Sequence, residues 1–336
     1  MTFSLAKKIF ITHIILFSLS TIAFAEPSDP NFDLVSPQTK TLCQQTDQAK
    51  PPAADIPDDQ QAKQLKNCDA ASLYYGFTGA PDVVKARQCA FVTKNYGVLA
   101  MIYANAKGVE RNLDLAIQYA CKAGFAADEI EARVMHLVDL KNQHWQGDNF
   151  DLCDDVTSGY MMGVCADVQQ KLASSKTQKQ MAAVIGQWSE SDKKSFEQLL
   201  KSANQYFEIR GENEVDLSGT DRVASQLEEE QNLRNDFYAS LVAFEKGQLP
   251  QFSQEQADKL DQDLNSIYKK IQRDSQFTMG SIDRAGVKKT QLQWLKYREA
   301  WVEFGKQKYP KVTPESWRAW LTKKRVKMLQ ELAGSD

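Results

Sequence analysis

Residues 99–124 read LAMIYANAKGVERNLDLAIQYACKAG, and this stretch decides the fold of the N-terminal half of the chain. Small side chains at Ala100 and Ala116 allow two helices to approach closely, and Tyr103 fills the space between them. Gly108 supplies the backbone freedom that a tight turn requires. The stretch therefore predicts two antiparallel helices joined by a short turn.

The same stretch resembles a SEL-one-like repeat, a relative of the tetratricopeptide hairpin. A poorer copy precedes it in LYYGFTGAPDVVKARQCA, residues 73–90. Two copies are too few for a long solenoid, because stacked repeats gain stability from their neighbours. We therefore expect residues 64–145 to form a short helical repeat module, with a generic Ala-rich helical pair as the alternative. The repeat match rests on these positions: Leu99, Tyr103, Gly108, Val109, Ala116, Lys122 and Ala123.

The chain after residue 150 also favours helices. Ser189, Ser253 and Thr313 each stand where a helix N-cap is expected, and Pro314 fits the first helical position. Apolar residues then recur at helical spacing, and no stretch alternates with period two. The predicted fold class is all-α: a short helical-hairpin repeat module followed by one or two small helical-bundle domains.

The N-terminus has the pattern of a secretion signal over residues 1–25. Lys7 and Lys8 precede an apolar run, and Ala23-Phe24-Ala25 fits a cleavage site. The run is short for a membrane anchor, so we expect a periplasmic or secreted protein without stable membrane insertion. Residues 26–63 contain six of the ten prolines, a pattern that predicts an extended arm held mainly by its cysteine.

Six cysteines remain after the signal, and an even number in an oxidising compartment predicts three disulfides. Cys153 and Cys165 are close enough in sequence to close one short segment. Cys68 and Cys89 can face each other across a helical hairpin that turns near residue 80. Exclusion leaves Cys43 with Cys121. A metal site is the alternative, but the spacing shows no CxxC pair.

Composition argues against several classes of function. The chain carries 41 Lys and Arg against 44 Asp and Glu, and without Lys7 and Lys8 the balance is 39 − 44 = −5, which disfavours a nucleic-acid binder. Only His136 and His144 remain after the signal, and we find no catalytic motif of the hydrolase, metalloprotease or nucleotide-binding kind. The sequence therefore predicts a protein that is not an enzyme and binds no cofactor or metal.

Residues 252–332 contain three motifs in a fixed order: D-x-x-LN-x-x-Y, Q-x-x-W-x-x-x-R and LT-x-x-R-x-x-x-L. This order resembles the lysozyme-inhibitor LprI-like domain, a small helical domain of bacterial envelope proteins, although two of the usual cysteines are missing here. The motif positions look structural first, and they are Asp261, Leu264, Asn265, Tyr268, Gln291, Trp294, Arg298 and Arg325.

Residues 151–248 could be a first, degenerate copy of this domain. The family's opening cysteine motif appears in loose form from Cys153 to Cys165, and at an offset of 88 Tyr206 meets Trp294 and Arg210 meets Arg298. The alternative is a single domain with a long helical insertion.

The resemblance implies non-covalent inhibition of a lysozyme, with the acidic chain attracting a basic enzyme. The candidate partner loop is residues 211–221, with Glu212, Glu214, Asp216 and Asp221 as its carboxylates; a solvated connection without a specific role is the alternative. A second hypothesis is an interaction scaffold built on residues 64–145. The sequence leaves open which lysozyme would be bound and the oligomeric state.

Overall fold

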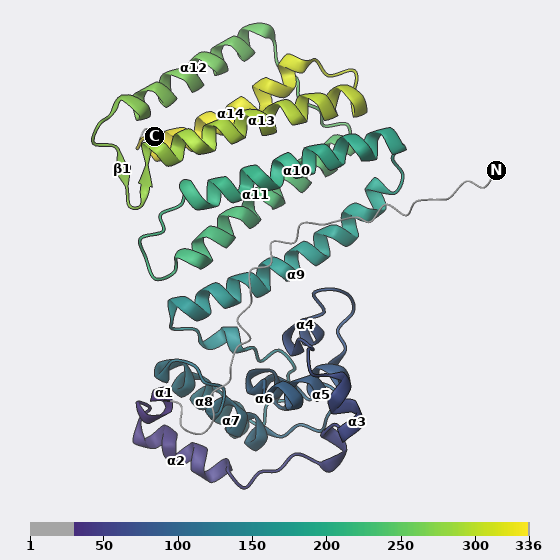
Figure 1. The fold of residues 1–336 in the computed structure, drawn as a ribbon, viewed down its shortest axis with the longest axis vertical. Coiled ribbons are helices and arrows are strands. Elements are labelled where there is room, and N and C mark those ends of the chain that lie inside the picture. Colours follow the sequence, from purple (N-terminus) through teal and green to yellow (C-terminus); the bar gives the residue numbers. More distant parts are fainter. Residues whose placement is uncertain (1–29, 335–336) are drawn as a thin grey trace, which may run out of the picture. The chain divides into compact units, whose positions relative to one another are not determined.

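The computed structural model describes residues 30–334, which form fourteen α-helices, two short 3-10 helices and one two-stranded hairpin. The predicted signal segment, residues 1–25, lies outside the described residues. The prediction of an all-α fold is confirmed (Figure 1). The described chain divides into two compact units: residues 30–74 with 83–150, and residues 75–82 with 151–334.

The first unit consists of short helices. In chain order they are α1 (Pro30–Asp33), α2 (Pro37–Thr46), η1 (Ala53–Asp55), α3 (Asp59–Gln64), α4 (Ala70–Tyr75), α5 (Val83–Thr93), α6 (Tyr96–Asn105), α7 (Leu113–Cys121) and α8 (Ala127–Asn142).

The hairpin expected over residues 99–124 is formed by α6 and α7. Ala100 and Ala116 are both fully buried, and α6 packs against α7, as small side chains on facing helices allow. Gly108 has a positive φ of 67°, as the turn requires, and the side chain of Asn112 caps α7 by accepting from the backbone N–H of Leu115 at 3.0 Å. Sequence alone therefore predicted this hairpin down to its turn residue.

The prediction of an extended arm over residues 26–63 is wrong for its described part. Pro37 occupies the first turn of α2 behind the N-cap Ser36, where a fixed φ favours a helix. The helix packs against α7 and α8. Cys43 is not its only anchor, because Nε2 of Gln118 donates to three carbonyl oxygens at the end of α2 and just after it, at 3.0 to 3.1 Å.

The structure pairs the six cysteines in the combination expected. Cys43–Cys121 has a Cα–Cα distance of 6.0 Å, Cys68–Cys89 has 6.0 Å and Cys153–Cys165 has 5.7 Å, all within the range of ordinary disulfides. The first two bridges lie in the first unit and the third in the second unit. Cross-links of this density are typical of proteins that fold outside the reducing cytoplasm.

The second unit consists of longer helices and the hairpin. Its elements are η2 (Leu152–Asp155), α9 (Gly159–Ile185), α10 (Glu190–Asn213), α11 (Arg222–Glu245), α12 (Gln254–Arg273), β1 (Thr278–Met279), β2 (Ile282–Asp283), α13 (Arg284–Lys308) and α14 (Pro314–Leu332).

The caps expected from sequence are present in this unit. Ser189 and Thr313 each accept a backbone N–H from the residue three positions later, at 3.1 and 3.2 Å. Ser253 and Gln256 form a reciprocal capping box at the start of α12. Each cap fixes where its helix begins, and so sets which apolar residues face the core.

One aromatic-rich hydrophobic core runs through α10, α11, α13 and α14. Trp301 lies at its centre, with its ring centroid 5.2 Å from that of Phe237 and 6.0 Å from that of Trp317. In Figure 1, α13 and α14 lie between α12 and the pair α10–α11. The second unit has two halves, α9–α11 and α12–α14. The strongest packing between these halves is α10 against α13.

The two halves of this unit repeat the same packing order. The first helix of each half, α9 or α12, packs on the third, α11 or α14, and the second helix also packs on the third. Buried positions correspond at an offset of 88 residues: Leu233 with Leu321 and Leu241 with Leu329 are buried in α11 and α14.

Residues at this same offset also contact each other across the two halves. Nε2 of Gln293 lies 3.2 Å from Oε1 of Gln205, and Nζ of Lys324 lies 2.6 Å from a carboxylate oxygen of Asp236. Around a two-fold axis, a residue near the axis meets its own symmetry mate. These two contacts therefore have the geometry of an approximate two-fold axis between the halves.

Candidate functional site

The motif residues of the C-terminal domain come from all three of its helices. Leu264 lies on α12, Gln291 and Trp294 on α13, and Arg325 on α14, and all four are buried. Tyr268 is half-buried, and burial raises the pKa of its phenol. These side chains hold the three helices together, so most of the motif is used by the fold itself.

Arg325 forms a buried polar centre. Its guanidinium donates to both carboxylate oxygens of Glu214 at 2.6 Å and to Oε1 of Gln291 at 2.9 Å. The side chains of Arg325 and Glu214 are both 0% exposed. Burial alone would lower the pKa of the guanidinium, but the charge and hydrogen bonds of Glu214 outweigh it and raise that pKa. Arg325 thus joins α14 to α13 and to the end of α10.

Arg298 occupies the surface side of the same domain. Its Nη1 lies 3.5 Å from Oγ1 of Thr322 on α14 and 3.8 Å from a carboxylate oxygen of Asp261 on α12. Its guanidinium carbon also lies 5.1 Å from the ring centroid of Trp294, a cation–π distance. This arginine of the motif therefore ties α13 to both neighbouring helices.

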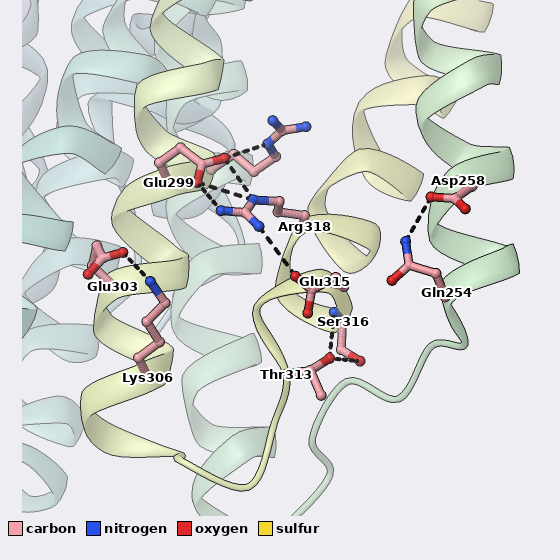
Figure 2. Close-up of polar contacts among 10 residues, drawn as sticks. Gln254, Asp258, Glu299, Glu303, Lys306, Thr313, Glu315, Ser316 and Arg318 are labelled. Atoms are coloured by element: carbon pink, nitrogen blue, oxygen red, sulfur yellow. Dashed lines mark hydrogen bonds and ion pairs between the residues drawn. The ribbon is translucent and has the colours of Figure 1, made fainter.

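Glu299 links this arginine to a second one. Figure 2 shows Arg318 turned toward Glu299, with Nη2 at 2.8 Å from one carboxylate oxygen and Nε at 3.2 Å from both. Arg298 approaches the same carboxylate at 3.1 Å, and Glu315 lies 3.7 Å from Arg318. Hydrogen bonding to Arg318 is the main reason why the pKa of Glu299 lies below its usual value. The network is partly exposed and joins α13 to the first turn of α14.

Asn265 forms its hydrogen bonds within its own helix. Its Nδ2 donates to the backbone oxygen of Asp261 at 2.8 Å and to the Asp261 carboxylate at 3.1 Å, one turn earlier on α12. Both residues are exposed. The Asn265 side chain therefore bonds a carbonyl oxygen of its own helix.

The predicted partner loop differs most from the structure. Residues 211–213 belong to α10, and Glu214 is buried on Arg325, so it cannot reach a partner. Glu212 pairs with Lys289 at 3.2 Å. Asp216 accepts the backbone N–H groups of Ser218 and Ser281 at 3.0 and 2.9 Å, which lower its pKa.

Asp221, the last carboxylate of the predicted loop, is exposed and accepts from the hydroxyl of Ser225 at 3.3 Å. Each of the four predicted carboxylates is therefore occupied by the chain's own groups. The loop was predicted from its acidity and its glycines, and neither pattern shows which carboxylate the fold will bury or pair.

Charge divides between the two halves of the second unit. Residues 151–248 contain 10 Lys and Arg against 17 Asp and Glu, a formal charge of −7. Residues 252–332 contain 17 Lys and Arg against 10 Asp and Glu, a formal charge of +7. Because exposed charges separated by more than about 8 Å are largely screened at physiological salt, each half presents its own sign to a partner. The net charge of the whole chain hides this division.

A shallow groove of about 350 Å³ opens between α12 and α14, lined by Asp263, Ile267 and Val326 among others. Among residues 30–334, no three His, Cys, Asp or Glu side chains converge as metal ligands would. No helix of the described chain is both long and apolar enough to cross a membrane.

Comparison with known protein families gives a match in the C-terminal region. Residues 245–329 match the family described as lysozyme inhibitor LprI, and this is the region in which the three sequence motifs lie. No curated protein matches the chain, and no solved structure does. The C-terminal domain is therefore similar to a family of inhibitors rather than enzymes, whose expected partner is a protein such as lysozyme.

Proposed function

We propose that this protein binds and inhibits a lysozyme in the bacterial periplasm through its C-terminal domain, without any catalytic step of its own. The observation that carries the proposal is the match of residues 245–329 to the lysozyme inhibitor family. The packing of the motif residues supports it. Arg325 and Arg298 connect the three helices of the matched region, as a complete domain requires.

The disulfides support the proposed location outside the cytoplasm. Three cross-links within the described chain, together with the LprI-like domain, indicate an extracytoplasmic protein. The periplasm is the compartment in which an inhibitor would meet a lysozyme before the enzyme reaches peptidoglycan. The predicted signal over residues 1–25 would deliver the chain there.

We also propose that residues 151–248 are a first, diverged copy of the matched domain. The repeated packing order of α9–α11 and α12–α14 supports this, as do the contacts between Gln205 and Gln293 and between Asp236 and Lys324. A single domain with an inserted helical segment gives no reason for residues 88 positions apart to meet. On this interpretation the chain contains an internal pseudo-dimer.

The alternative function, a scaffold built on the helical repeats, has less support. In the first unit α2 packs on α7 and α8, and the disulfide Cys43–Cys121 holds it there. A peptide that used this face would have to displace a covalently attached segment. Only a partner that uses another face of the unit would suit the scaffold hypothesis.

The proposal is tested by measuring whether the full mature protein inhibits lysozymes. Lysozymes of the c, g and i types would be assayed by the clearing of a cell-wall suspension, with the protein added at micromolar concentration. We expect slower clearing with at least one type and no hydrolysis by the protein alone. Full activity of every type in its presence would exclude the proposed function.

A further inference from the structure

One face of α13 carries two lysines that flank an exposed leucine. Lys288, Leu292 and Lys296 follow one another at spacings of four residues, so their side chains lie on one face of the helix. The opposite faces of α13 bury Trp294 and Trp301 in the core. Leu292 is 54% exposed, and within residues 252–332 it and Met279 are the large apolar side chains left open to solvent.

Unlike neighbouring lysines of α13, Lys288 and Lys296 form no ion pair within the described chain. Lys289 pairs with Glu212 at 3.2 Å and Lys306 with Glu303 at 2.7 Å. In the described chain no carboxylate lies within 4.0 Å of the ammonium of Lys288 or Lys296. Each ammonium therefore keeps three hydrogen-bond donors for an outside group. Together Lys288, Leu292 and Lys296 are called the α13 row below.

The first half of the unit does not have this row. At the offset of 88 residues, the corresponding positions on α10 are Leu200, Asn204 and Glu208. Since α10 forms an equally long and well-packed helix without the two cations, the fold does not require them. The row belongs to the half that matches the inhibitor family and carries the charge of +7.

The chemistry of a lysozyme cleft complements the row. Retaining glycosidases place two carboxyl groups about 5–5.5 Å apart beside the scissile bond, so the centre of the cleft is acidic even where the enzyme is basic overall. Lys288 and Lys296 are eight residues apart, about 12 Å along the helix axis. One ammonium can therefore reach the carboxylates while the other contacts the rim and Leu292 covers apolar surface between them.

We infer that the α13 row is the surface that occupies the carboxylate-lined cleft of the target lysozyme. The inference rests on the proposed function. It also predicts one enzyme per chain, because the first half lacks the row in spite of its similar packing.

The experiment reverses the two charges in the full mature protein. Lys288→Glu with Lys296→Glu is compared with Lys194→Glu with Lys201→Glu on α10. Lys194 and Lys201 are also exposed lysines of a long helix, and both variants change the charge by the same amount because each replaces two lysines with glutamates. Kd is measured by titration calorimetry against the lysozyme that the wild type inhibits, and circular dichroism checks that both variants fold.

Long-range attraction and direct contact with carboxylates predict opposite changes in Kd for the α13 variant. Long-range attraction alone would make either acidic variant bind a basic enzyme more tightly. Direct contact with carboxylates predicts at least a roughly tenfold weaker Kd for the α13 variant, because like charges then meet in the interface. The α10 variant should bind as tightly as the wild type or more tightly. A milder second variant, Leu292→Ala, should weaken binding about fivefold through lost apolar contact.

Three outcomes would overturn the inference. Wild-type binding that survives the α13 reversal would place the contact elsewhere while leaving the proposed function intact. Equal weakening by both reversals would point to general electrostatics instead of the row. A calorimetric stoichiometry of two enzymes per chain would also contradict it. Absence of binding by the wild type itself would refute the proposed function, which is a distinct result.

Discussion

Removal of the charge of Glu214 should destabilise the second unit strongly. Glu214 follows the last residue of α10 and holds the guanidinium of Arg325 through two hydrogen bonds of 2.6 Å. Neither side chain is exposed to solvent. Glu214→Gln keeps the shape of the side chain but leaves the buried guanidinium without a full counter-charge.

The expected loss of unfolding free energy follows from the burial of this ion pair. Breaking a buried ion pair by removing one partner costs about 3–5 kcal/mol of unfolding free energy. For a unit of this size that corresponds to a fall in Tm of roughly 6–20 °C. The matched control is Glu212→Gln, two residues earlier, whose ion pair with Lys289 is exposed. An exposed pair contributes about 1 kcal/mol or less, so the control should stay close to the wild type.

Urea unfolding monitored by tryptophan fluorescence suits this comparison, because five of the six tryptophans lie in the second unit. The double variant Glu214→Leu with Arg325→Met removes both charges, and it should recover most of the loss because no unpaired charge remains. If Glu214→Gln lowers the unfolding free energy by no more than Glu212→Gln does, the buried pair does not have the role derived for it.

Three further predictions concern the same fold. The low pKa of Glu299 beside Arg318 means that its contribution to stability is present above the usual glutamate pKa and is lost as the pH falls through the lowered value; the Tm difference between wild type and Glu299→Gln should therefore shrink on acidification, and a constant difference from pH 7 to pH 2 would contradict it. Gly305→Ala would force a methyl group into the ring of Trp317 and should cost about 1–3 kcal/mol in urea unfolding; an unchanged midpoint would show that the ring moves freely. Peptide mass mapping of the non-reduced protein should recover the three disulfides given above, and a different pairing or six free thiols would refute the structure of the cross-links.

The sequence predicted the elements whose signals are local. The hairpin of α6 and α7 follows from small residues and one turn glycine, and the caps at Ser189, Ser253 and Thr313 mark helix starts within a few residues of chain. The arm before residue 64 was misread because prolines near one another suggest an extended chain. Pro37, however, lies in the first turn of a helix, where proline is favoured because the backbone N–H that it lacks would have no partner in the helix.

The sequence by itself determined that this chain is helical, cross-linked by three disulfides and similar to lysozyme inhibitors in its last third. These properties depend on short-range periodicity, on the number and spacing of cysteines, and on motifs contained within single helices. Tertiary structure alone decided which charges a partner can meet. Glu214 and Lys296 both look like surface charges in the sequence, yet one is buried against Arg325 and the other stands unpaired on α13. The reason is that exposure and pairing depend on helices more than a hundred residues apart, which come together only when the core around Trp301 is packed.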